Sequence, residues 1–365
     1  MITQLHITAL KSIEEITVPC TNLNLLTGAN SSGKSTFLQA LLLISQNAAA
    51  WQGLNGNYVS LGDFRDVKNF RSSANQIVIQ AVIDSDSKIC LVFEEETETE
   101  LQRSITQQFL GETKEAAKQE KKIPPFPKIP DICYLSCDRV GALDVYQKKY
   151  GFSEIGIHGE YAFHYLQAHS MDPLEQALIR DSSLQTLLGQ VNAWLEYIVG
   201  TSVAVEDITG TDKVKAAFDA GSGRYVRPRN IGSGVSYLIS ILILCLSAKK
   251  DTIILIENPE IHLHPRAQSR LCEFFCFVAK ANRQIFLETH SDHIFNGIRA
   301  GIAMGDVKKE EVAINYFELN ENKSTKHTKI EIGKNGRIVN YLEGLFDQFD
   351  VDMERMLSLD FIPRR

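Results

Sequence analysis

Residues 23–45 read LNLLTGANSSGKSTFLQALLLIS. The stretch begins with apolar residues typical of a strand, passes through a loop of Gly, Asn and Ser, and ends in an apolar pattern typical of a helix. Gly28 is followed after four residues by Gly33, Lys34 and Ser35, which is the Walker A spacing of a phosphate-binding loop. Because the motif requires this strand–loop–helix context, the stretch predicts an α/β nucleotide-binding fold.

The loop residues predict how a nucleotide is held. Glycines allow backbone N–H groups to curl around phosphate oxygens, and the following helix directs the positive end of its dipole towards them. Lys34 is expected to reach the β and γ phosphates of ATP, and Ser35 is expected to offer its hydroxyl to Mg²⁺, which prefers hard oxygen ligands. The predicted phosphate-loop residues are Gly28, Asn30, Ser31, Ser32, Gly33, Lys34, Ser35 and Thr36.

Composition limits the class of protein. The 365 residues are 44% hydrophobic and 23% charged, which predicts a globular chain with one large core plus a lobe, or two domains. The net charge of -7 excludes a basic surface over the whole molecule but not a local basic patch. The N-terminal sequence shows no signal-peptide pattern and the longest apolar run, 237–248, is too short to span a bilayer, so a cytoplasmic protein without membrane contact is expected.

Cysteine and histidine spacing argues against a zinc site. The seven cysteines include no CxxC pair, and we expect buried, reduced thiols. His262 and His264 stand two residues apart after a predicted strand, which favours a packing or dimer-contact loop over metal ligation.

Strands are predicted where β-branched residues alternate or cluster, and helices fall mainly between the last four of these strands. The predicted strands are 5–10, 23–26, 77–83, 89–93, 132–135, 203–208, 252–256, 284–287 and 312–319.

The pattern between these strands divides the chain. Residues 95–128 are charged and end in a proline-rich stop, which predicts a surface insertion. Residues 159–199 have a helical pattern and predict a lobe inserted into the nucleotide-binding core. The predicted units are two halves of one head, 1–94 and 224–330, an insertion and helical lobe over 95–223, and a C-terminal tail over 331–365.

Two strands in the second half end in groups suited to phosphate chemistry. Strand 252–256 runs into Glu257, as expected of a Walker B strand that delivers a carboxylate to a metal-bound phosphate. Strand 284–287 is followed by Glu288, Thr289 and His290, and a histidine there can hydrogen-bond the γ-phosphate and distinguish ATP from ADP.

A second glycine-rich helix start precedes both strands. In RNIGSGVSYLISILIL, residues 229–244, Gly232, Ser233 and Gly234 open an apolar helix whose N-terminus is suited to a phosphate. The same residues fit a plain helix-capping turn when taken alone. Because one bound nucleotide needs only one such helix N-terminus from its own chain, the second is expected to contact the nucleotide bound by a neighbouring subunit.

The order of these motifs resembles a known family. Walker A, a Gly-Ser-Gly helix, Walker B followed by HLHP, and the THS sequence at 289–291 resemble the ABC-type ATPases related to the SMC, recombination-repair and overcoming-lysogenization-defect families. More narrowly, YLSCDRVGA at 134–142, ENPEIHLHP at 257–265 and the tail resemble bacterial AAA-family ATPases with a short C-terminal domain of unknown function, many from phage-defence or nuclease operons. In this tail NYLEG stands where Trp-Pro-Gly-Phe is expected.

The resemblance implies an ABC-type P-loop NTPase head with a mixed β-sheet, an inserted helical lobe and a short tail. It also implies a head-to-tail homodimer, or a higher even oligomer, that closes on two ATP molecules. Gly232, Ser233, Gly234 and Ser236 are then the signature that contacts ATP in trans, and His290 is the switch histidine.

The end of the Walker B strand departs from the family pattern. Related ATPases carry Asp then Glu, whereas this chain carries Glu257 and Asn258, and an amide cannot accept a proton. Either Glu257 combines the metal and water roles, or Glu260 reaches the attacking water, or hydrolysis is slow. We favour a slow ATPase with Glu257 on the metal, because phosphoryl transfer depends more on positioning than on a strong base. Gln52 and Gln80 fit equally the glutamine that contacts Mg²⁺ in related ATPases.

Three functions compete. The first is an ATP-driven switch in anti-phage defence whose dimer closure controls a separate effector protein, docked on the 159–199 lobe or the tail. The second is an ATP-dependent DNA-binding or repair ATPase, and the basic loop 224–230 leaves nucleic acid open as a ligand. The third, a self-contained nuclease, is disfavoured because the tail is too short for convergent metal-binding carboxylates. We favour the first, since SMC-type clamps need longer coiled-coil arms than 95–128 provides.

Overall fold

The computed structural model describes residues 1–83, 87–95, 129–150 and 154–359. The predicted surface insertion over 95–128 lies outside these residues except for Glu95, and it stays a prediction. In the described part, no helix is both long enough and apolar enough to cross a bilayer.

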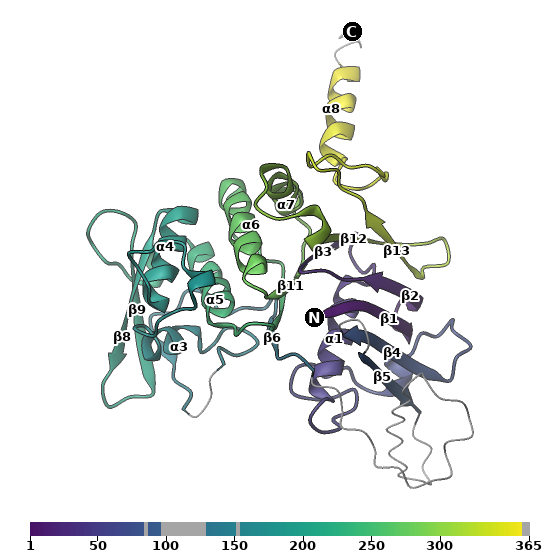
Figure 1. Ribbon diagram of the computed structural model, residues 1–365, viewed down its shortest axis with the longest axis horizontal. Helices are drawn as coiled ribbons and strands as arrows, with labels where there is room; N and C mark the ends of the chain where they lie inside the picture. The colour runs from purple at the N-terminus through teal and green to yellow at the C-terminus, as the bar shows by residue number, and fades with distance from the viewer. Residues whose placement is uncertain (84–86, 96–128, 151–153, 360–365) are drawn as a thin grey trace.

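A six-stranded mixed sheet forms the centre of the molecule (Figure 1). Five strands are parallel, and only the edge strand β13 runs antiparallel to its neighbour. Their central residues are continuous apolar runs because both faces of the sheet are covered. In spatial order the strands are β13 (Thr325–Ile330), β12 (Val312–Leu319), β3 (Leu23–Gly28), β11 (Gln284–Glu288), β10 (Ile253–Glu257) and β6 (Ile132–Leu135).

Strand β6 corrects the predicted domain division. It lies inside the range 95–223 that was assigned to an insertion and lobe, yet it pairs in parallel with β10. The core sheet therefore extends into that range. Strand β13, at the other edge, was not predicted, because its sequence TKHTKI has few apolar residues.

A second, antiparallel sheet and one helix cover one face of the core sheet. Helix α1 (Lys34–Gln46) packs between the sheets, and its Phe37 ring lies 6.0 Å from that of Phe286 on β11. The Gln284 side chain joins the two sheets, since it accepts from the Ile2 N–H at 2.8 Å and donates to the Ile2 carbonyl at 2.6 Å. In spatial order the second sheet holds β2 (Ile13–Pro19), β1 (Ile2–Leu10), β4 (Gln76–Ile83) and β5 (Ser87–Glu94).

Helices cover the opposite face, and a small third sheet lies on the outer side of some of these helices, away from the core sheet (Figure 1). The small sheet is antiparallel, with β9 between β7 and β8. The elements on this side are α3 (Ala162–Ala168), α4 (Leu187–Val199), α5 (Ser233–Ser247), α6 (Pro265–Lys280), α7 (Asp292–Met304), β7 (Tyr146–Gln147), β8 (Ser202–Ile208) and β9 (Lys213–Asp219). Short helical turns occupy α2 (Phe64–Val67), Gln176–Leu178, Pro228–Asn230 and Lys309–Glu311.

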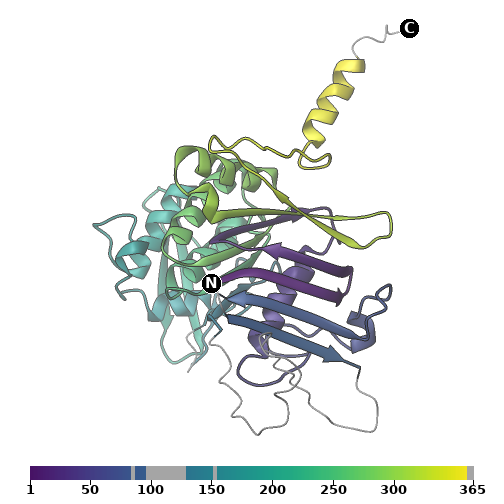
Figure 2. The same ribbon diagram turned by 45° about the vertical axis from the view of Figure 1, so that its right-hand side comes forward.

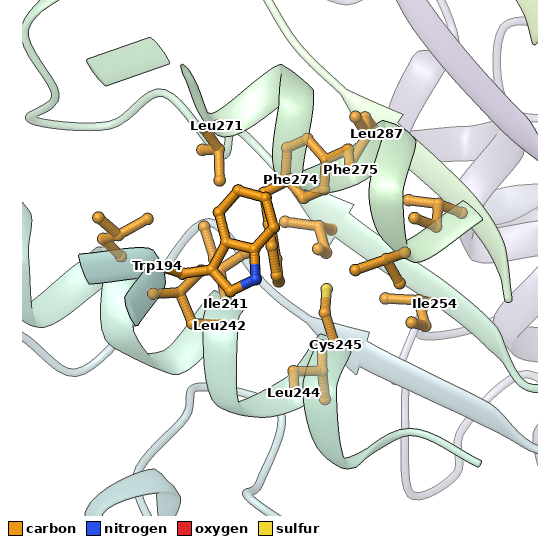
Figure 3. Packing of buried hydrophobic residues seen from close by; sticks show 14 of the residues in the cluster. Trp194, Ile241, Leu242, Leu244, Cys245, Ile254, Leu271, Phe274, Phe275 and Leu287 are labelled. Atoms are coloured by element: carbon orange, nitrogen blue, oxygen red, sulfur yellow. The ribbon is translucent and has the colours of Figure 1, made fainter. Parts of the chain in front are cut away.

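The predicted 159–199 lobe holds two helices, α3 and α4, joined by a largely irregular segment. Its apolar face is covered by this chain itself: Trp194 of α4 lies 4.9 Å, centroid to centroid, from Phe274 of α6 (Figure 3). Val191 and Leu195 of α4 are fully buried. This apolar face is therefore not free for a partner, and docking of an effector elsewhere on the lobe stays a prediction.

The C-terminal helix α8 (Gln348–Leu359) projects away from the rest of the chain in both views (Figures 1 and 2). It follows an irregular segment that begins after β13. Of the two docking regions predicted for an effector, the tail is the one that presents an exposed apolar helix.

Candidate functional site

The predicted phosphate-binding loop joins β3 to α1 and needs glycine at both ends. Gly28 and Gly33 have φ angles of 135° and 107°, which residues with a Cβ rarely adopt. A Cβ on Gly28 would lie 1.9 Å from the Phe317 carbonyl oxygen, and one on Gly33 would lie 2.6 Å from Thr325 Oγ1. The two glycines therefore let β12 and β13 pack directly against the loop.

A cavity of about 450 Å³ opens at this loop. All of the predicted phosphate-loop residues except Gly28 line it, and so does the predicted switch residue His290. Neither Gln52 nor Gln80 is among the lining residues. Sequence analysis did not assign three further lining residues: Lys11, Ser12 and Glu288.

Lys34 is buried at the base of the cavity. Its Nζ donates hydrogen bonds to the carbonyl oxygens of Gly28, at 3.0 Å, and Ala29, at 2.7 Å. Burial lowers the pKa of Lys34, while the charge of Glu288 opposes that shift. A buried ammonium group gains from a nearby anion, so this position suits a phosphate.

Glu288 is the acid that contacts the hydroxyl group of Ser35, the predicted Walker A serine. Ser35 Oγ donates to Glu288 Oε1 at 2.7 Å. Sequence analysis placed Ser35 and Glu257 together on the metal, but the parallel register sets Glu257 beside Glu288, so that Glu288 lies between Glu257 and the loop. Glu288 is therefore a further candidate for the metal beside Ser35, and the role of Glu257 stays a prediction.

The Glu288 carboxyl group fits a divalent cation. Its Oε2 is buried and has no hydrogen-bond partner. Burial raises the pKa of Glu288 to about 7; Glu257 and Glu260 add to the rise, and Ser35 and Lys34 oppose it. A cation would satisfy the free oxygen and offset the clustered acids.

Glu257 is held by the segment that follows β6. Tyr134 donates its hydroxyl to Glu257 Oε1 at 2.8 Å, and the Cys137 N–H donates to Oε2 at 3.1 Å. Arg139 donates to the carbonyl oxygens of Glu257, at 2.9 Å, and Asn258, at 2.5 Å. Burial and the Glu257 charge raise the pKa of Tyr134, which keeps its hydroxyl a donor. The motif at 134–142 thus fixes the end of β10, a role that its sequence did not reveal.

Asn258 adopts a left-handed backbone conformation, with φ of 42°. Its N–H donates to the Glu288 carbonyl oxygen at 2.7 Å and ties β10 to β11. Asn tolerates this conformation better than Glu does, which gives a structural reason for the departure from the family pattern.

Glu260 is linked to the switch histidine. Its Oε1 accepts the backbone N–H of His290 at 2.9 Å, and its Oε2 is buried without a hydrogen-bond partner. Burial and the Lys34 charge lower the pKa of His290, which favours a neutral imidazole at pH 7. Glu260 and His290, predicted from separate motifs, therefore lie together.

The predicted signature residues start α5, away from the residues that line this cavity. Gly232 and Ser233 are exposed, as a contact in trans requires. Ser236 is 1% exposed, so its side chain cannot reach a second subunit, which corrects that part of the prediction. Gly234 is also buried, and a Cβ there would lie 2.3 Å from the His262 carbonyl oxygen.

His262 and His264 have structural contacts. His264 Nδ1 accepts from the Arg266 N–H at 3.3 Å and caps α6, and the His262 ring lies 5.1 Å from the Tyr237 ring. Within the described ranges, no three or more His, Cys, Asp or Glu side chains are arranged to hold a metal by themselves. Mg²⁺ does not need such a cluster, because it commonly keeps waters and phosphate oxygens as ligands. All seven cysteines are free thiols, and Cys20, Cys245, Cys272 and Cys276 are buried.

Solved structures similar to this chain include three heads of SMC proteins. The Smc head bound to the C-winged helix domain of ScpA is 13% identical with a TM-score of 0.48, and the match covers 91% of this chain and 98% of that one. The head from Thermotoga maritima is 8% identical with a TM-score of 0.44, over 91% and 99%. The head with an extended coiled coil from Pyrococcus furiosus, bound to the C-terminal domain of ScpA, is 11% identical with a TM-score of 0.48, over 99% of each chain.

Sequence families give a firmer comparison. No curated protein matches the chain. Residues 307–356 match a protein family of unknown function, DUF3696, so this match begins before the predicted tail and includes β12 and β13. Residues 1–150 and 160–295 match the AAA ATPase domain, and because this match spans more than half of its length, the chain belongs to the AAA ATPase domain family.

Proposed function

We propose that the chain binds and hydrolyses ATP with Mg²⁺, and that ATP-dependent dimerisation makes it a switch for a separate effector protein in anti-phage defence. The observation that carries the ATPase proposal is the cavity in which Lys34 and Ser35 meet Glu288 and His290. Membership of the AAA ATPase domain family supports it. The defence role is supported only by the sequence resemblance described above.

Each residue of the cavity and its surroundings has a proposed role in ATP binding or hydrolysis. Lys34 binds the β and γ phosphates, and Ser35 and Glu288 would hold Mg²⁺, which when bound offsets charge on the phosphate oxygens. Glu260 orients the attacking water through its free oxygen, and His290 contacts the γ-phosphate. Because Glu260 accepts the backbone N–H of His290, a movement of His290 on loss of the γ-phosphate would also move the Glu260 carboxylate.

The dimer proposal follows from the start of α5. Gly232 and Ser233 are exposed there but are not among the residues that line the Lys34 cavity. A neighbouring subunit could present its γ-phosphate to this helix N-terminus. Two chains would then bind two ATP molecules between them.

Light scattering and nucleotide binding test the proposal together. At a protein concentration where the nucleotide-free chain is monomeric, a non-hydrolysable ATP analogue should produce dimers. Lys34→Ala should lose nucleotide binding, whereas Ser233→Glu should bind the analogue and fail to dimerise. Asn322→Glu, an equal charge change in an exposed turn, is the control and should dimerise like the wild type. A wild-type chain that binds the analogue and stays monomeric would refute the switch.

A DNA-binding or repair ATPase is the second candidate. Arg224, Arg227 and Arg229 are exposed within the loop that leads into α5. Binding through these residues would weaken with salt, because each neutralised phosphate releases counterions. DNA affinity measured over a salt series, with Arg227→Ala against the wild type, distinguishes this candidate from the first.

A further inference from the structure

Helix α8 presents an apolar stripe that nothing in the described part of the chain covers. Phe349, Met353, Met356 and Leu357 are 71%, 38%, 54% and 58% exposed. At about 100° per residue, these four side chains fall on one side of the helix. A contiguous stripe of large apolar side chains on a projecting helix marks an interaction surface.

Acidic residues border this stripe on both sides. Asp350 and Glu354 follow one edge, and Asp352 lies at the other, where it pairs with Arg355 at 3.5 Å. The surface that receives α8 should therefore have an apolar floor and positively charged edges. Two α8 helices packed against each other would instead bring like charges together.

A second cavity of this chain has that chemistry. It has a volume of about 430 Å³ and lies where α4 ends and where α5 and α6 begin. Val199, Val235 and Leu263 are among its apolar lining, and Arg266 and Arg270 are its guanidinium groups. His262 and His264 add two imidazoles, while Glu196 is the one acid among the lining residues.

The two surfaces lie too far apart to meet within one chain. Figure 1 shows α8 at the upper right of the molecule, whereas α4 and α5 lie at the left, beyond α6 and α7. Figure 2 also shows α8 pointing away from these helices. A second copy of the chain is therefore the occupant that brings the two surfaces together.

We propose that α8 of one copy docks into the α4–α5–α6 cavity of a second copy. Apolar side chains of the stripe fill the cavity, and the flanking carboxylates face Arg266 and Arg270. The contact joins two different surfaces, so two copies can exchange their α8 helices around a two-fold axis. It requires no nucleotide. Gly232 and Gly234 also line the cavity, so docked α8 would cover the start of α5 and would compete with the proposed ATP-driven dimer.

Sedimentation velocity of the full chain without nucleotide, over a range of concentrations, tests this docking. Reversible self-association is expected, and Met353→Asp should weaken it on the order of tenfold or more. Met304→Asp is the matched control, because Met304 is 79% exposed at the end of α7, outside both surfaces, and should leave association unchanged. A chain that stays monomeric at every concentration refutes the proposal.

Charge exchange identifies the surfaces. Glu354→Arg and Arg266→Glu should each weaken association, and the double variant should recover most of the loss because the charges are again opposite. Since α8 projects from the body, unchanged far-UV circular dichroism is expected for the Glu354 variant. If the double variant associates no better than either single variant, α8 does not meet this cavity.

Discussion

Glu288→Gln tests the proposed metal site of Ser35 and Glu288 through stability as well as nucleotide binding. The pKa of Glu288 is raised from 4.5 to about 7 by burial. The carboxyl group therefore binds its proton more tightly in the folded chain than in the unfolded chain. The unfolding free energy gained from this difference is fully present below pH 4.5 and is lost as the pH rises through about 7. At about 1.4 kcal/mol for each pH unit between these values, the loss by pH 8 is about 3 kcal/mol. The amide that replaces the carboxyl group in the variant carries no charge and should not show this loss.

Denaturant unfolding without nucleotide and with EDTA, at pH 5 and at pH 8, measures this difference. The wild type should lose more unfolding free energy between the two pH values than Glu288→Gln does, by about 2.5 kcal/mol, because a small part of the loss already occurs below pH 5. Glu310→Gln, at an exposed carboxyl, is the control and should follow the wild type. Mg²⁺-dependent strengthening of ATP binding should also fall in Glu288→Gln. The proposal that Glu288 holds the metal would be refuted by two results together. The unfolding free energies of wild type and Glu288→Gln would depend equally on pH, and the Mg²⁺ dependence of ATP binding would be lost only in Glu257→Gln.

Three further results are expected. Glu260→Gln should slow phosphate release by about 10²-fold or more while ATP still binds, and the effect should exceed that of Glu257→Gln. A larger effect of Glu257→Gln would mean that Glu257 orients the attacking water. Asn258→Glu should lower the unfolding free energy by about 1 kcal/mol through its left-handed backbone, measured by denaturant unfolding, and no loss would mean that the turn relaxes. Trp194→Ala should cost about 3–5 kcal/mol in the same assay, since it empties the contact with α6, and a cost under about 1 kcal/mol would contradict that packing.

Much of the core was predictable because of how parallel strands are buried. Strands β10 and β11 are continuous apolar runs, and each ends at an acid, so the sequence indicated both the strand and its functional end. Strand β9, KVKAAFD, was missed because charged residues interrupt its apolar positions on a partly exposed sheet. The sequence predicted β6 as a strand but did not predict its pairing with β10. Which strands pair was therefore harder to predict than where the strands lie.

The site was predictable where one segment supplies its residues. The Walker A spacing predicted Lys34 and Ser35 from local sequence alone, and both line the cavity. The contact between Ser35 and Glu288 depends instead on β11 lying between β3 and β10, a pairing of distant segments. The sequence showed Glu288 at a strand end but could not show which neighbour it faces.

The packing of β12 and β13 on the phosphate-binding loop has a consequence for biosynthesis. The Thr325 N–H donates to the Ser12 carbonyl oxygen at 2.8 Å, the hydroxyl groups of these two residues lie 2.8 Å apart, and Gly33 packs against the Thr325 side chain. Strand β12 also supplies the parallel partner on one side of β3. A growing polypeptide that has emerged only as far as residue 311 would expose β3 as an open edge, prone to pairing with other chains. The cavity at the loop can therefore form only after β12 and β13, near the end of the given sequence, have been synthesised.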